Sequence, residues 1–284
     1  TPGGTGWFRT EFAVTVADGV IERRRFQFAV ERAREEVPSD PRFVLQGHFR
    51  GGYPLEVMPI LESRGASMFR DEMSWSSVER QRETFRFPQR YVDYARKAER
   101  LGLNILLILD YSNRHYDEGG FPYSEEARKG FARYARTVAR KFKGQIRHYE
   151  VWNEWSIGCG MDTKGDPDRY VDLLRPTYRA VKSVDPGATV VGVGGEHSGH
   201  HYDNIQTMFE DGGLDYMDAV SVHSYRYPRS PEESDLRGEL ERVGDLIRDY
   251  GGDHKIWVTE IGWPTHTGPR GVSERRQAHY LVRS

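Results

Sequence analysis

The sequence has few of the features that mark disulfide-rich, membrane-spanning or nucleic-acid-binding proteins. Cys159 is the only cysteine among 284 residues, which excludes an intrachain disulfide and a cysteine-rich metal cluster. No apolar run approaches the length of a membrane span. The 41 basic and 43 acidic residues almost cancel, so a nucleic acid is not an expected partner.

What the sequence does contain is length and aromatic side chains. A chain of 284 residues suits either two ordinary domains or one (β/α)8 barrel. Aromatic residues make up 12% of the chain, and their rings can cover the C–H faces of a neutral sugar or simply fill a core. Length and composition therefore leave the fold and the function open.

The N-terminal residues follow a different pattern from the rest of the chain. Apolar residues alternate on both sides of Asp18-Gly19 between residues 7 and 30, which predicts a β-hairpin. The run Arg23-Arg24-Arg25 within it is interpreted as a solvated edge that discourages aggregation rather than a binding patch. We expect residues 1–40 to form a hairpin or accessory β element and residues 41–284 to form a separate domain.

From residue 42 onward, short β-rich apolar runs alternate with longer segments of helical periodicity. One unit repeats about every 35 residues, close to the spacing of an α/β protein with the (β/α)8 TIM-barrel fold. The sequence provides only seven strands, so we expect a barrel truncated before its eighth strand. The seven predicted strands lie at 43–45, 66–69, 104–109, 146–152, 189–193, 219–222 and 256–259.

Two glutamates lie where predicted strands end. Glu154 follows the fourth strand and Glu260 ends the seventh, and in a barrel the carboxyl ends of the strands converge on one mouth. Glycoside hydrolysis needs two carboxyl groups across the scissile bond, one protonated and one ionised. Each glutamate alone is more often an exposed loop residue, but the pair predicts Glu154 as general acid/base and Glu260 as nucleophile.

The run Trp152-Asn153-Glu154 together with Thr259-Glu260 resembles the signature of glycoside hydrolase clan A. Within the clan, Met68-Phe69-Arg70 and Leu109 to Asn113 look most like family 39, which includes β-xylosidase and α-iduronidase relatives and bacterial exopolysaccharide hydrolases. Residues 260–264 also resemble a run of plant-type β-1,3-glucanases, so the substrate stays open. The resemblance implies a retaining hydrolase that cleaves O-glycosidic bonds of an oligosaccharide or polysaccharide, with no cofactor.

The same resemblance implies roles for several other residues. Asn153 would hydrogen-bond the sugar 2-hydroxyl, unless it is an ordinary strand-end cap. Arg70 would hold Glu260 ionised, or form a structural ion pair with Glu150. His223 and Tyr225 follow the sixth strand and could position the nucleophile, or be barrel-rim packing residues. Two tryptophans are candidate stacking platforms for sugar rings or core residues, namely Trp75 and Trp263.

Two alternatives remain open from the sequence. A barrel of this kind could bind glycans without cleaving them. The loop Glu196 to His201 could instead supply His197, His200 and His201 to a metal-dependent hydrolase, although its spacing is not that of the helical metalloprotease motif. We expect no metal at the main site, and we interpret the histidine loop as lining the cleft or solvated.

Overall fold

The structure is a computed structural model that describes residues 6–16, 19–30, 40–160, 165–196 and 202–284. Contacts divide the chain into two compact units, Thr1–Pro38 and Ser39–Ser284. No helix in these described ranges is long and apolar enough to cross a membrane. The two units are described separately below.

The first unit is the antiparallel strand pair predicted from the alternating pattern. Strand β1 (Gly6–Val16) pairs with β2 (Gly19–Val30) from Gly6↔Val30 to Val16↔Gly19, with one register shift after Val14. Arg23 and Arg25 both contact the carboxylate of Glu11 on the facing strand. These exposed ion pairs agree with the interpretation of the arginine run as a solvated edge.

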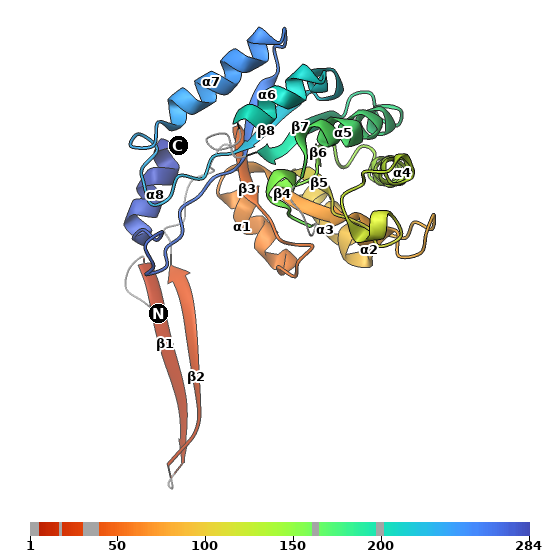
Figure 1. The fold of residues 1–284 in the computed structure, drawn as a ribbon. Helices are drawn as coiled ribbons and strands as arrows, with labels where there is room; N and C mark the ends of the chain where they lie inside the picture. Colours follow the sequence, from red (N-terminus) through yellow and green to blue (C-terminus); the bar gives the residue numbers. More distant parts are fainter. Residues whose placement is uncertain (1–5, 17–18, 31–39, 161–164, 197–201) are drawn as a thin grey trace. The chain divides into compact units, whose positions relative to one another are not determined.

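The second unit is built around a curved sheet of seven parallel strands in sequential order (Figure 1). The strands are β3 (Asp40–Gln46), β4 (Ala66–Ser74), β5 (Asn104–Asp110), β6 (His148–Val151), β7 (Thr189–Glu196), β8 (Ala219–His223) and β9 (Lys255–Glu260). Sequential order with parallel pairing is the arrangement of a (β/α)8 barrel. Seven barrel strands were predicted, and these seven confirm that prediction. Within the described ranges no strand joins β9 to β3, so the wall stays open between them.

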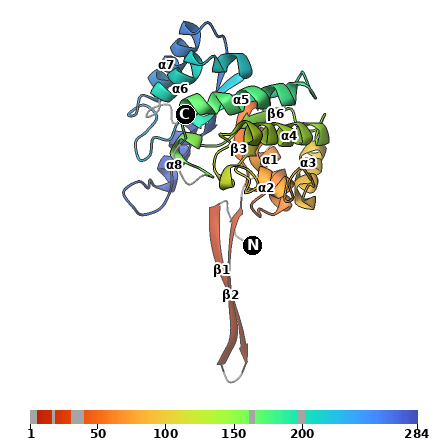
Figure 2. The same ribbon diagram turned by 45° about the vertical axis from the view of Figure 1, so that its right-hand side comes forward.

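Helices cover the outer face of this sheet (Figure 2). They are α1 (Met58–Ser63), α2 (Trp75–Val78), α3 (Gln89–Arg100), α4 (Glu125–Lys141), α5 (Pro167–Lys182), α6 (Tyr202–Glu210), α7 (Leu236–Asp249) and α8 (Glu274–Arg283). Helix α4 begins where Ser124 accepts a hydrogen bond from the Ala127 backbone. It buries an apolar stripe, which includes Phe131 and Val138, against the sheet.

Alternation along the strands decides which side chains enter the barrel. Met68 and Leu106 pack with Val191 and Ala219 in a small inner cluster, which identifies the interior face of β4, β5, β7 and β8. Because side chains two residues apart share a face, Arg70 on β4 also points inward. The interior therefore changes from apolar to charged toward the carboxyl ends of the strands.

Candidate active site

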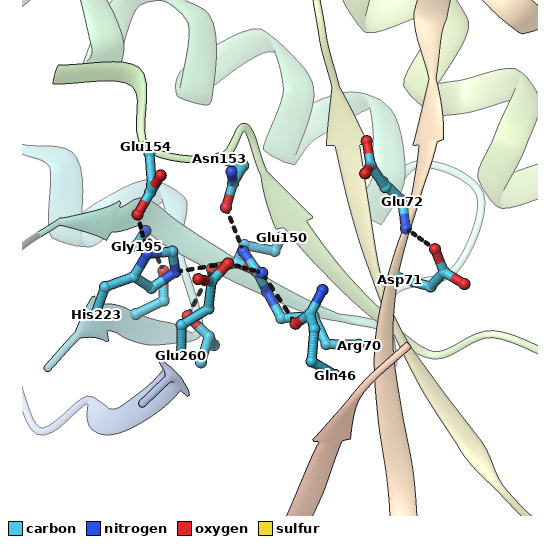
Figure 3. Close-up of polar contacts among 12 residues, drawn as sticks. Gln46, Arg70, Asp71, Glu72, Glu150, Asn153, Glu154, Gly195, His223 and Glu260 are labelled. Carbon is cyan, nitrogen blue, oxygen red and sulfur yellow. Dashed lines mark hydrogen bonds and ion pairs between the residues drawn. The ribbon is translucent and has the colours of Figure 1, made fainter. Parts of the chain in front are cut away.

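The candidate site lies at the carboxyl ends of β4, β6, β8 and β9, where the sequence predicted it. Figure 3 shows Arg70, Asn153, Glu154, His223 and Glu260 converging on one region. One carboxylate oxygen of Glu154, one of Glu260 and a ring nitrogen of His223 all lie within 4.8 Å of one another. Two strand ends separated by more than 100 residues of sequence thus bring their carboxylates together.

An unusual backbone turn presents Glu154 to this region. Strand β6 ends at Val151, and Trp152 and Glu154 both adopt left-handed φ values, +66° and +47°. Such values are rare for residues other than glycine and cluster at functional sites. The turn is held by a hydrogen bond from the Glu154 backbone N–H to the Gly194 carbonyl on β7. The predicted strand at 146–152 is shorter in the structure, His148–Val151, and this turn sets its carboxyl end.

Glycine at position 195 is needed for His223 to reach the glutamates. Gly195 has φ +69°, and a Cβ atom there would lie only 2.1 Å from His223 Nε2. The buried His223 ring therefore lies against bare backbone, with Nδ1 2.9 Å from Glu154 Oε1 and Nε2 3.6 Å from Glu260 Oε1. The sequence placed His223 beside the nucleophile, whereas its shorter contact is to Glu154.

Glu260 is held by one cation and one hydroxyl group. Arg70 Nη1 lies 2.5 Å from Glu260 Oε1, and the Tyr225 hydroxyl donates to Glu260 Oε2 at 2.7 Å. Burial, followed by the negative charge of Glu260, raises the pKa of Tyr225, so this phenol remains a donor at ordinary pH. Both contacts stabilise negative charge on Glu260.

Arg70 combines the two roles that the sequence left open. Its guanidinium is 1% exposed and also contacts Glu150 Oε2 at 2.6 Å and Asn153 Oδ1 at 2.7 Å. Burial alone would lower the pKa of Arg70, but the charges of Glu150 and Glu260 outweigh it and raise the pKa. Arg70 is thus both half of a buried ion pair and a partner of Glu260.

Asn153 is fixed at both ends of its amide. Its Oδ1 accepts from Arg70, and its Nδ2 donates to the Tyr111 hydroxyl at 3.0 Å. Tyr111 belongs to the run after β5 that carries part of the family 39 resemblance, and sequence reasoning assigned it no role. It was missed because a single tyrosine in a loop carries no spacing signal.

Cys159 contacts the predicted acid/base, a role that sequence reasoning did not find. Its thiol donates to Glu154 Oε2 at 3.2 Å. Burial and then the hydrogen bond to Glu154 raise the pKa of Cys159 to about 12, so the thiol remains protonated at neutral pH. The two carboxylate oxygens of Glu154 therefore have different neighbours, the imidazole of His223 and the thiol of Cys159.

The two tryptophans are packed inside the protein. Trp75 is 0% exposed and stacks on Tyr116, while Trp263 is 2% exposed and donates to the Arg229 carbonyl. Neither ring offers a free face to a sugar, which corrects the expectation that they form stacking platforms. The reason is that a tryptophan next to a strand end can turn outward under a helix as readily as into the mouth.

The alternative metal loop, with His197, His200 and His201, lies outside the described residues. Elsewhere in the described part of the chain, Glu154, His223 and Glu260 have the donor types and spacing that a transition metal ion could use. Two of these groups, Glu154 and Glu260, are also the type of carboxyl pair that acid/base and nucleophilic chemistry uses.

Similarity to known proteins was found at the level of fold. No protein-family model and no curated protein sequence matches the chain. The structure of a family 39 glycoside hydrolase from the gut symbiont Bacteroides cellulosilyticus WH2 matches with a TM-score of 0.78 at 22% identity, over 98% of this chain and 60% of that one. A family 39 β-xylosidase from Caulobacter crescentus matches with a TM-score of 0.65 at 17% identity, over 88% and 60%.

A third match is the xylanase XynB from Paenibacillus barcinonensis in complex with a conduramine derivative. Its TM-score is 0.61 at 16% identity, over 83% of this chain and 78% of that one. The chain therefore shares the fold of family 39 glycoside hydrolases, as the motif resemblance indicated. It spans about 60% of the length of the first two of these structures.

Proposed function

We propose that this protein hydrolyses O-glycosidic bonds with retention of configuration. The observation that supports this most directly is the placement of Glu154 and Glu260, whose nearest carboxylate oxygens lie within 4.8 Å at the mouth of the barrel. Retaining enzymes have carboxyl groups about 5–5.5 Å apart, whereas inverting enzymes need about 6.5–9.5 Å to admit a water molecule. The short separation favours direct attack by a nucleophile.

In the first proposed step, the ionised Glu260 attacks the anomeric carbon while Glu154 gives its proton to the leaving oxygen. The C–O bond to the leaving group breaks, and a covalent glycosyl ester forms on Glu260. Arg70 and the Tyr225 hydroxyl hold the Glu260 carboxylate in place for attack. Asn153, fixed by Arg70 and Tyr111, is positioned to meet the sugar 2-hydroxyl.

In the second proposed step, Glu154 removes a proton from a water molecule, which attacks the anomeric carbon and releases Glu260. The carboxylate of Glu154 must act as acid and then as base without changing place. Its two different neighbours, His223 on Oε1 and Cys159 on Oε2, fix the carboxylate in one orientation. The sugar product leaves with the configuration of the substrate.

A panel of 4-nitrophenyl β-glycosides and polysaccharides tests the proposal, with product configuration followed by proton NMR. Release of the retained anomer supports it, and release of the inverted anomer refutes the nucleophile assignment. Binding of glycans without release would favour the inactive-barrel alternative. Activity that is lost with a chelator and restored by a metal would favour the histidine-loop alternative.

A further inference from the structure

A second polar group lies next to the candidate active site and is not used by the proposed mechanism. Glu72 on β4 lies two residues beyond Arg70, and Asp110 is the last residue of β5. Strand alternation puts Glu72 on the same inward face as Arg70, and Asp110 on the same face as Leu106. Figure 3 shows Glu72 further along β4, to one side of the group formed by Arg70 and the two candidate catalytic glutamates.

Asp110 is fully buried, and its neighbour is another carboxyl group. Its side chain is 0% exposed, and neither oxygen accepts from an N–H or O–H donor among the described residues. Burial, and then the adjacent charge of Glu72, raise the pKa of Asp110 well above its usual range. A protonated Asp110 can donate a hydrogen bond to the carboxylate of Glu72.

Glu72 is the member of the pair that solvent can reach. Its side chain is 17% exposed, and its Oε2 lies 3.1 Å from Nη1 of Arg50, a side chain that is 33% exposed. The pair also adjoins the proposed sugar-binding groups, because Tyr111, which accepts from Asn153, directly follows Asp110. The Glu72 carboxylate and the Arg50 guanidinium thus place an acceptor and a donor side by side.

Resting on the proposed function, we infer that Glu72 is a specificity-determining residue that accepts hydrogen bonds from the hydroxyl groups of a neutral sugar, with Asp110 as its positioning residue. The Glu72 carboxylate can accept a hydrogen bond from one sugar hydroxyl group, and the adjacent Arg50 guanidinium can donate to the neighbouring hydroxyl group. A sugar carboxylate in the same position would instead be repelled by the like charge of Glu72. The preferred substrate class is therefore a neutral glycoside rather than a uronide.

The test compares the wild type with Glu72→Gln on 4-nitrophenyl β-xyloside, β-glucoside and β-glucuronide, and on monodeoxy analogues of the best neutral substrate. Loss of a hydrogen bond to a charged group costs roughly 10- to 100-fold in kcat/KM. We expect Glu72→Gln to lose this much kcat/KM on the neutral glycoside. On the monodeoxy analogue that lacks the hydroxyl group contacted by Glu72, the variant and the wild type should have the same kcat/KM. Glu62→Gln, an exposed change on α1, is the matched control and leaves kcat/KM unchanged.

Asp110 is tested separately, in case Glu72→Gln fails to fold. Asp110→Asn keeps a donor beside Glu72 and is expected to stay within roughly threefold of wild type, whereas Asp110→Leu removes it and falls roughly tenfold or more. Infrared difference spectroscopy should show the C=O stretch of a protonated carboxyl group that disappears in Asp110→Asn. Equal activity of the Asn and Leu variants, or absence of that band, overturns the positioning role.

Two further outcomes separate this inference from the proposed function. The inference is overturned if the wild type prefers the glucuronide, or if Glu72→Gln leaves the turnover of neutral glycosides unchanged. Either result leaves the proposed hydrolysis of glycosides intact. Saturation-transfer NMR with xylose and glucose gives a readout independent of turnover. Binding that Glu72→Gln weakens, in a protein that cleaves none of the glycosides, supports the inference and refutes the proposed function.

Discussion

Replacing Arg70 distinguishes its structural role from its proposed functional role. Arg70→Met removes the charge but keeps a long side chain, so Glu150, which is 0% exposed, becomes a buried anion without its cation. Breaking a buried pair in this way costs about 3–5 kcal/mol. For a domain of this size each kcal/mol shifts Tm by about 2–4 °C, which predicts a Tm lower by roughly 10 °C.

The double variant Arg70→Met/Glu150→Gln supplies the decisive comparison. The second change, Glu150→Gln, removes the buried charge that Arg70→Met leaves without a cation. In the wild type the Thr259 hydroxyl donates to Glu150 at 3.1 Å, and the glutamine side-chain oxygen can accept the same hydrogen bond. We expect most of the lost Tm to return in scanning calorimetry. Turnover of the best 4-nitrophenyl glycoside should remain at least roughly 100-fold below wild type, because Glu260 still lacks its cation.

Recovery of both Tm and kcat in the double variant would refute this reasoning and reduce Arg70 to a structural ion pair. A Tm that stays low would show that Glu150 is not the main cause of the instability. The exposed pair Arg237–Glu241 on α7 provides the control, since its replacement by Met and Gln should leave both Tm and kcat unchanged.

Three further predictions concern the same site. Glu260→Gln should lower kcat by roughly 10⁴-fold or more. Azide should restore turnover of Glu154→Gln on substrates with good leaving groups, because azide replaces the water that needs a general base. Rescue of Glu260→Gln by azide, instead of Glu154→Gln, would reverse the roles of the two glutamates. With a thiol pKa of about 12, Cys159 should react with iodoacetamide at pH 8 roughly a thousandfold more slowly than glutathione. Removing the charge of Glu154 lowers the pKa of Cys159, so Cys159 should react faster in the Glu154→Gln variant than in the wild type. Equal rates of Cys159 in the wild type and the variant would contradict the contact. Gly195→Ala places a Cβ atom against the His223 ring at a position with a left-handed backbone. Thermal unfolding followed by circular dichroism should therefore show a lower Tm, and kcat should fall at least tenfold. Wild-type Tm and kcat in this variant would show that Gly195 does not lie against His223.

The sequence by itself determined the architecture and the central pair of carboxylates. Alternating apolar runs and helical stripes repeat regularly, and each run has to bury its apolar face, so strand number and order follow from local pattern. Glu154 and Glu260 could be placed because strand ends in a parallel barrel share one mouth. Asn153 and Arg70 could be named because the runs Trp152-Asn153-Glu154 and Met68-Phe69-Arg70 resemble those of a known family.

Only the tertiary structure decided the partners of these residues. Whether Trp75 and Trp263 face a cleft or a helix depends on side-chain direction at irregular turns, which no periodicity encodes. The contact of Cys159 with Glu154 depends on the left-handed turn at Trp152 and Glu154, and left-handed φ values in residues other than glycine leave no mark in the sequence. The placement of Asp110 beside Glu72 depends on the register of β4 against β5 and on burial, both of which arise from packing between distant segments.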